Sequence, residues 1–402
     1  MACDIALAVA EEESVTLKVV VVGAGVVGAA CAFHATAAGM DVTVIARGPV
    51  GAGTTSRGEG NILVSDKEPG PELSLARLSR TLWEEAGEEI GPESFELEHK
   101  GGLVVAGTSK GLTALNAFAA RQAAAGVRVE PVEHVRDLEP HLAPGIPGGV
   151  HYPDDAQVQP VLAAAALLNA AVARGARLLT GEVTAATAGR DDRVTGVRTA
   201  TGDLLFADAV VNAAGTWGGE VGRRLGAPIE VLPRRGFVLV TEPLPPMVRH
   251  KVYSADYVAN VASSGAGLET SCVVEGTRGG TILIGASRER VGFDMTLNPA
   301  VLTTLAAQAC RLFPFLRKVH LIRAYRGFRP YCPDHLPVVG PDPRVPHVIH
   351  ACGHEGAGIG LAPATGALVT AHLLGRPWRG ADPAAYTALL PDRFFTCGGA
   401  PT

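Results

Sequence analysis

The chain has 402 residues, of which 47% are hydrophobic and 19% are charged, and its formal net charge is −5. This composition is typical of a globular protein with roughly two or three domains, and it excludes an intrinsically disordered one. The weakly negative charge gives no electrostatic reason to expect nucleic acid or an anionic membrane as a partner.

The seven cysteines form no CxxC pair and show no metal-ligand spacing, so we expect reduced thiols, a cytoplasmic location and no metal site. Residues 1–17 contain three consecutive glutamates and no basic segment, which argues against a signal peptide. The most apolar helical stretch, 161–173, falls short of the roughly 20 residues that cross a bilayer, so no membrane span is expected.

Residues 19–28 read VVVVGAGVVG, which is a buried strand running into a GxGxxG motif. In such a motif Gly23 permits the tight turn, and Gly25 lets a pyrophosphate approach the backbone. Gly28 allows the following helix to pack closely on the strand. The motif therefore predicts a dinucleotide site.

A helix is expected over 26–38, with Val26 and Val27 in its first turn, and a second strand over 41–45. The positive end of that helix would face the phosphates. The strand–turn–helix–strand order supports dinucleotide binding, but it does not distinguish FAD from NAD.

Further elements follow from apolar periodicity and from glycine and proline boundaries. Helices are expected at 71–90, 109–125, 160–174, 299–312 and 362–374. Short strands are expected within 95–106, and a hairpin or meander of short strands within 178–206. Single strands are expected at 209–215, 237–241, 252–258, 268–274, 281–285, 319–328 and 345–351. The order indicates an α/β fold, in which an antiparallel substrate domain interrupts a discontinuous nucleotide-binding domain.

Four later motifs accompany the first: GTTSRGEGN at 53–61, NAAGTW at 212–217, GFRP at 327–330 and GHEGAGIGLAP at 353–363. In this order and spacing they resemble the FAD-dependent D-amino-acid oxidase, glycine oxidase and sarcosine oxidase superfamily. Within it, 65–70 and 329–337 are most similar to the flavin subunits of opine oxidases, D-hydroxyproline dehydrogenases and hydrogen cyanide synthases. The resemblance covers nearly the whole chain after residue 17.

The resemblance implies a Rossmann-type, glutathione-reductase-like FAD domain over 18–90, 150–225 and 330–390. An antiparallel-sheet substrate domain would cover 91–149 and 226–329. Non-covalent FAD is expected, because Cys332 directly precedes Pro333 instead of standing where relatives attach the flavin. Besides the glycine-motif residues, the expected FAD contacts are Arg47, Thr54, Thr55, Ser56, Gly60, Asn61, Ile62, Val183, Ala213, Ala214, Gly215, Trp217, Gly353, Glu355, Gly356, Ala357, Gly358, Ile359 and Gly360.

One departure from the family pattern concerns the end of the second strand. Relatives carry a carboxylate there that hydrogen-bonds the adenosine ribose. Here Ala46 occupies the position and Arg47 follows it. Either Arg47 and loop backbone compensate, or FAD binds less tightly than usual, and Ala46→Glu is then expected to tighten FAD binding.

The resemblance implies that Arg329 binds a substrate carboxylate, since arginine offers a bidentate fork; the alternative is a structural ion pair. His354 either bonds backbone beside the flavin or acts on flavin or substrate directly. Tyr253 and Tyr257, four apart on one expected strand face, either contact substrate or fill the core. Glu59 either contacts the substrate amine or is solvated.

These motifs together predict oxidation of the C–N bond of an amino acid or secondary amino acid. A hydride would pass to flavin N5, and the imine product would be hydrolysed. The alternative is a flavin-carrying subunit that passes electrons to partner subunits, so a homo- or hetero-oligomer is expected. An NAD-dependent dehydrogenase is disfavoured, because 53–61 and 353–363 would have no role in it.

Overall fold

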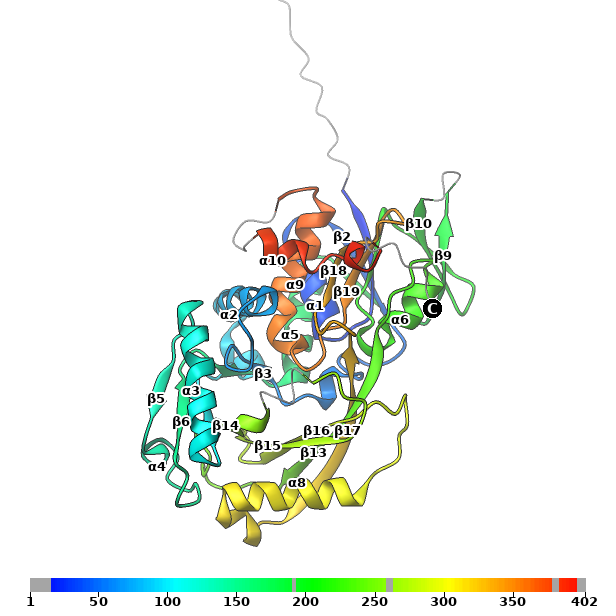
Figure 1. The fold of residues 1–402 in the computed structure, drawn as a ribbon. Coiled ribbons are helices and arrows are strands. Elements are labelled where there is room, and N and C mark those ends of the chain that lie inside the picture. The colour runs from blue at the N-terminus through cyan, green and yellow to red at the C-terminus, as the bar shows by residue number, and fades with distance from the viewer. Residues whose placement is uncertain (1–15, 190–192, 258–262, 378–382, 396–402) are drawn as a thin grey trace, which may run out of the picture.

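Two large β-sheets with covering helices form most of the computed structural model, which describes residues 16–189, 193–257, 263–377 and 383–395 (Figure 1). The N-terminal residues 1–15, Cys3, Val258 and Cys397 lie outside this part of the chain. The expectations about a signal peptide and about those two thiols therefore concern residues that are not described.

The first sheet has six strands, and their order places the glycine motif near its centre. From one edge to the other they are β18 (Val338–Pro341), β19 (Val348–Cys352), β12 (Ala209–Asn212), β1 (Lys18–Val22), β2 (Asp41–Ala46) and β8 (Arg177–Thr180). All neighbours are parallel except β18 and β19. The all-valine run 19–22 suits a central parallel strand that is buried on both faces.

Alternating side chains of β1 pack on two different layers. Val19 and Val21 belong to the core shared with the helices α1 (Val26–Ala37), α2 (Pro71–Ile90), α5 (Pro160–Ala173) and α9 (Gly358–Leu373). Val20 and Val22 belong to the core on the other face. That face is covered by a three-stranded sheet and a short helix: β9 (Val183–Ala188), β10 (Val194–Thr199), β11 (Leu204–Phe206) and α6 (Gly218–Arg224).

The second sheet has eight strands and is antiparallel apart from the pair β14 and β4. Its order is β17 (Leu321–Tyr331), β13 (Leu232–Thr241), β16 (Ile282–Arg288), β15 (Glu269–Gly276), β14 (Lys251–Ser254), β4 (Gly102–Ala106), β6 (Gly148–Tyr152) and β5 (Glu130–Val132). Helix α8 (Pro299–Leu312) packs against β13, β15 and β16, and α3 (Ser109–Ala124) lies beside β4 and β6 (Figure 1). The fold is therefore the expected α/β arrangement of a parallel dinucleotide-type sheet and a largely antiparallel second sheet.

Some element boundaries differ from those expected. Strand β14 ends at Ser254, so Tyr257 lies beyond it and does not share a strand face with Tyr253. Strands β6 and β17, which belong to the second sheet, extend past the domain limits expected at 150 and 330.

Helix α9 begins at Gly358, earlier than expected, although Pro363 lies inside it. Proline has no N–H and leaves the carbonyl four residues earlier without its helical donor. Here Trp83 of α2 supplies that donor, because its indole Nε1–H donates to Ile359 O and to Gly360 O, both at 3.2 Å. Ser79, one turn earlier in α2, accepts from the amide of Ala364 at 3.2 Å. Helix α2 thus compensates for the proline in α9.

Candidate cofactor and substrate site

A long cavity of about 350 Å³ opens at the carboxyl edge of the first sheet. Its lining includes the ends of three parallel strands, with Val22, Ile45, Ala46 and Ala351, and the residues directly after two more, Gly181 and Ala213. It continues to Gly327, Phe328 and Arg329 of β17 in the second sheet. Ligands of open parallel sheets bind outside these carboxyl ends.

The glycine motif has the geometry that its sequence predicts. Gly23 has a φ of +121°, and a Cβ there would lie 2.4 Å from the carbonyl oxygen of Ala213. A Cβ on Gly28 would lie 2.0 Å from the oxygen of Gly23, so helix and strand could not pack as they do. Only glycine allows this close turn.

The N-terminus of α1 is suited to an anion. Its cap residue, Gly25, has no side chain to satisfy the first amides, and the first turn carries no acidic residue. Thr55 Oγ1 accepts from the amide of Val26 at 3.1 Å, and both Val26 and Val27 line the cavity. The helix therefore presents its positive end to a diphosphate without a competing carboxylate. This uncompensated helix N-terminus is the reason that the turn fits the diphosphate of a dinucleotide such as FAD.

Most of the expected FAD contacts lie along the cavity. The lining contains Gly23, Gly25, Val26, Val27, Arg47, Thr54, Thr55, Asn61, Val183, Ala213, Ala214, Gly215, Trp217, Glu355, Gly356, Gly358 and Ile359. It does not contain Gly28, Ser56, Gly60, Ile62, Gly353, Ala357 or Gly360. Gly28 supports the turn as described, and Gly60, with a φ of +93°, brings its loop against Val158. Ser56 bonds the carbonyls of Ala52 and Gly53.

The end of the cavity beside β2 carries charged side chains that the sequence did not single out. Glu182, Glu220 and Arg224 all line it. Arg224 lies 2.6 Å from each of the two carboxylates, while Arg47 sits 3.8 Å from Glu182 and over the ring of Trp217. No sequence motif points to Glu182, because its proximity to Ala46 depends on the pairing of β8 with β2.

At the other end, Arg329 lines the cavity without a carboxylate partner among the described residues. Its Nη1 donates to the carbonyl of Ser287 at 2.8 Å. Burial, followed by the nearby Arg288 guanidinium, lowers the pKa of Arg329, although arginine keeps its charge in proteins. The expected alternative, a structural ion pair with a described residue, is not formed.

Glu59 also lines the cavity and is buried. Of the two alternatives expected for it, the solvated residue is therefore wrong. Its Oε2 lies 3.6 Å from Nζ of the buried Lys251, which in turn lies 2.7 Å from Glu275. Its Oε1 has no hydrogen-bond partner among the described residues. Two carboxylates therefore share one buried lysine beside the cavity.

The two tyrosines have different surroundings. Tyr257 lines the cavity, and the guanidinium of Arg288 lies 5.2 Å from its ring centroid. Tyr253 is fully buried, is not part of the lining, and donates its phenolic hydrogen to Ser65. The rings meet edge to face at 5.1 Å. Tyr253 is therefore a core residue that supports Tyr257, which corrects the expectation that both share one strand face toward the substrate.

His354 lines the cavity but is held as a neutral ring. Thr365 donates its hydroxyl to the carbonyl of Leu361 at 2.9 Å, so it accepts the Nε2–H of His354, also at 2.9 Å. Burial lowers the pKa of His354 to about 4. A neutral, hydrogen-bonded imidazole positions the glycine loop and carries no positive charge for a substrate carboxylate.

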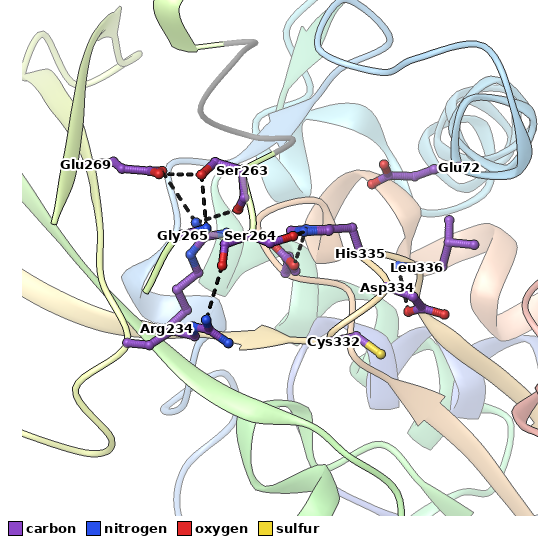
Figure 2. Close-up of polar contacts among 12 residues, drawn as sticks. Glu72, Arg234, Ser263, Ser264, Gly265, Glu269, Cys332, Asp334, His335 and Leu336 are labelled. Carbon is purple, nitrogen blue, oxygen red and sulfur yellow. Dashed lines mark hydrogen bonds and ion pairs between the residues drawn. The ribbon is translucent and has the colours of Figure 1, made fainter. Parts of the chain in front are cut away.

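Glu355 is paired within a polar cluster instead of acting as a free anion, and Figure 2 shows Arg234, His335, Ser263 and Ser264 of this cluster. Its carboxylate lies 2.9 Å from Nδ1 of His335 and 3.4 Å from Nη1 of Arg234. Arg234 also donates to the carbonyl of Ser263 at 2.9 Å, and the other ring nitrogen of His335 lies 2.8 Å from Ser264 Oγ. The cluster fixes the glycine loop against the second sheet.

Within the described ranges, no group of three or more histidine, cysteine, aspartate or glutamate side chains could hold a metal ion. No helix in the same ranges is long and apolar enough to cross a membrane.

The sheet, the anion-accepting turn at its carboxyl edge and the cavity that continues to the second sheet are those of a dinucleotide-binding protein. The chain belongs to the FAD dependent oxidoreductase (DAO) family, whose model matches residues 18–372. It is therefore an FAD-dependent enzyme, and its cofactor is FAD.

Among relatives, glycine oxidase of Geobacillus kaustophilus is 29% identical over 362 residues, covering 87% of this chain and 91% of that protein. Its crystal structure superposes with a TM-score of 0.81, covering 92% of this chain and 98% of the other at 27% identity. Hydrogen cyanide synthase subunit HcnC of Pseudomonas aeruginosa is 32% identical over 238 residues, or 59% of this chain. The match spans only about half, 54%, of the length of HcnC.

Proposed function

We propose that the enzyme oxidises the C–N bond of an amino acid or a secondary amino acid, using non-covalently bound FAD. The observation that carries this proposal is Arg329, a guanidinium in the cavity wall that has no carboxylate partner among the described residues. A substrate carboxylate would satisfy its remaining donors. The similarity to glycine oxidase over 91% of that protein supports the same substrate class.

The first sheet would hold the cofactor and the second sheet would supply the substrate contacts. Arg329 orients the carboxylate, and Tyr257 closes the wall beside it. The carboxylate of Glu59 stands in the same cavity as a counter-charge for the substrate ammonium. Contacts to both the carboxylate and the ammonium fix the position of the α-carbon in the cavity. Orientation of this kind supplies a large part of the catalytic effect.

When bound, FAD supplies a ring that accepts a hydride from the α-carbon at N5. The nitrogen must be neutral at that moment, so the ammonium proton has to leave. Glu59, which lines the cavity, is the side chain that we propose accepts it. The resulting imine is hydrolysed by water to an oxo acid and ammonia, or an amine where the substrate is a secondary amino acid.

Anaerobic bleaching of the bound flavin tests this proposal. The panel would hold glycine, sarcosine, D-amino acids, hydroxyprolines and opines, with the corresponding amines that lack a carboxylate as controls. We expect bleaching by the compounds that carry both an amine and a carboxylate, and none by the amines that lack the carboxylate. Equal bleaching by the carboxylate-free amines would refute the role of Arg329.

A second function has one observation in its favour, since one relative is described as a subunit, HcnC of hydrogen cyanide synthase. The chain would then oxidise the same substrates but pass electrons to partner subunits instead of oxygen. Reoxidation of the reduced protein by air-saturated buffer would support an oxidase. Slow reoxidation by oxygen with rapid reoxidation by an artificial acceptor would support the subunit.

A further inference from the structure

The adenosine end of the cofactor site lacks its usual carboxylate. A ribose hydroxyl is a hydrogen-bond donor that Rossmann-type proteins satisfy with an acidic residue at the end of the second strand. Ala46 stands there and has no polar side chain. Arg47 follows, but a guanidinium only donates hydrogen bonds and so cannot replace an acceptor.

The neighbouring strand brings an acceptor to the same place. Strand β8 pairs in parallel with β2, with Thr180 opposite Ala46. The amide of Gly181 donates to the carbonyl of Ala46 at 2.9 Å, which holds the loop after β8 beside the end of β2. Glu182 is the next residue and lines the cavity together with Ala46 and Val183.

Two arginines hold the Glu182 carboxylate by one oxygen. Nη1 of Arg224 lies 2.6 Å from Oε1, and Nη1 of Arg47 lies 3.8 Å from the same atom. Oε2 forms no hydrogen bond or ion pair with another described residue, and the side chain is 35% exposed. Arg224 is fixed in turn by the carbonyl of Val183 at 2.8 Å and by Glu220 at 2.6 Å. The free oxygen therefore remains available to a ligand.

From this geometry we propose that Glu182, supplied by β8, accepts the hydrogen bonds of the adenosine ribose in place of the missing carboxylate of β2. A carboxylate there suits hydroxyl donors and repels a 2′-phosphate, so it also selects against phosphorylated dinucleotides. The hydrogen bond to Arg224 lowers the pKa of Glu182 and keeps it ionised.

The test measures FAD and FMN affinities of the full chain by flavin fluorescence for Glu182→Ala and Asp41→Ala. Asp41 is a matched control, because its carboxylate also forms an ion pair between β2 and β8, with Arg177 at 3.6 Å, and does not line the cavity. We expect Glu182→Ala to weaken FAD binding roughly tenfold or more, as for loss of a charge-assisted hydrogen bond. FMN lacks the adenosine, so its affinity should stay within about twofold, as should FAD affinity in Asp41→Ala.

A second arm uses Ala46→Glu, which restores the usual carboxylate. In the unchanged background it should give no tighter FAD binding, because Glu182 already occupies that role. In the Glu182→Ala background it should recover most of the lost affinity, so that the two changes are strongly non-additive. Unchanged FAD affinity in Glu182→Ala, equal losses for FMN or Asp41→Ala, or tighter binding by Ala46→Glu alone would each overturn the proposal. If Glu182→Ala fails to fold, the FAD affinity of the single variant Ala46→Glu tests the proposal on its own.

Discussion

Arg329 illustrates how one side chain defines the substrate end of the site. One of its guanidinium nitrogens is fixed by the carbonyl of Ser287, and the side chain borders the cavity. Arg329→Lys keeps the charge but loses the planar fork. We expect KM for a carboxylated substrate to rise roughly ten- to hundredfold, as for loss of one charge-assisted hydrogen bond, while FAD stays bound.

Steady-state kinetics together with the visible flavin spectrum measure this effect. Arg326→Lys is a matched control, because Arg326 is on the same strand but does not line the cavity. An unchanged KM in Arg329→Lys, or an equal rise in Arg326→Lys, would contradict the carboxylate role.

How far the sequence predicts a residue's role depends on whether that role is set locally. Gly23 and Gly28 are set by a turn of a few residues, and the structure gives them the predicted geometry. Glu182 acts through the order of strands in the sheet, and that order is not visible from spacing along the chain. The sequence could not decide whether Tyr253 contacts the substrate or fills the core, and the expected strand face shared with Tyr257 is wrong because β14 ends at Ser254.

At the scale of elements, the packing of α2 against α9 shows how an irregular helix is stabilised from outside. Trp83→Phe removes the indole N–H that satisfies Ile359 and Gly360, and the buried carbonyls lose their donor. We expect a loss of about 1–3 kcal/mol in unfolding free energy, measured by denaturant titration.

The same element pair supplies the control. Pro363→Ala restores a backbone N–H inside α9, which can donate to Ile359 O. In the Trp83→Phe background it should recover part of the stability, whereas Trp83→Phe combined with Ala364→Ser should recover none. Recovery in neither double variant would mean that Trp83 stabilises α9 by packing alone.

For the whole molecule, buried histidines make stability depend on pH. Desolvation lowers the pKa of His34, His354 and His372 to about 4. The unfolded chain binds protons at these rings near pH 6.5, so stability falls as the pH drops from 6.5 towards 4. Asp155 opposes this trend, because burial raises its pKa to about 7 and its protonated form is favoured in the folded state over part of the same range.

His354→Gln isolates one of these contributions. Glutamine can keep a hydrogen bond to Thr365 but does not titrate, so the stability that the histidine loses on acidification should be retained. Between pH 7 and pH 5 the wild type should lose about 2 kcal/mol more than the variant, since its unfolded state gains a proton that the folded state does not take up. Denaturant titrations of both proteins at saturating FAD measure the difference. Identical pH slopes would mean that His354 is protonated in the folded enzyme, and its assignment as a neutral positioning residue would be wrong.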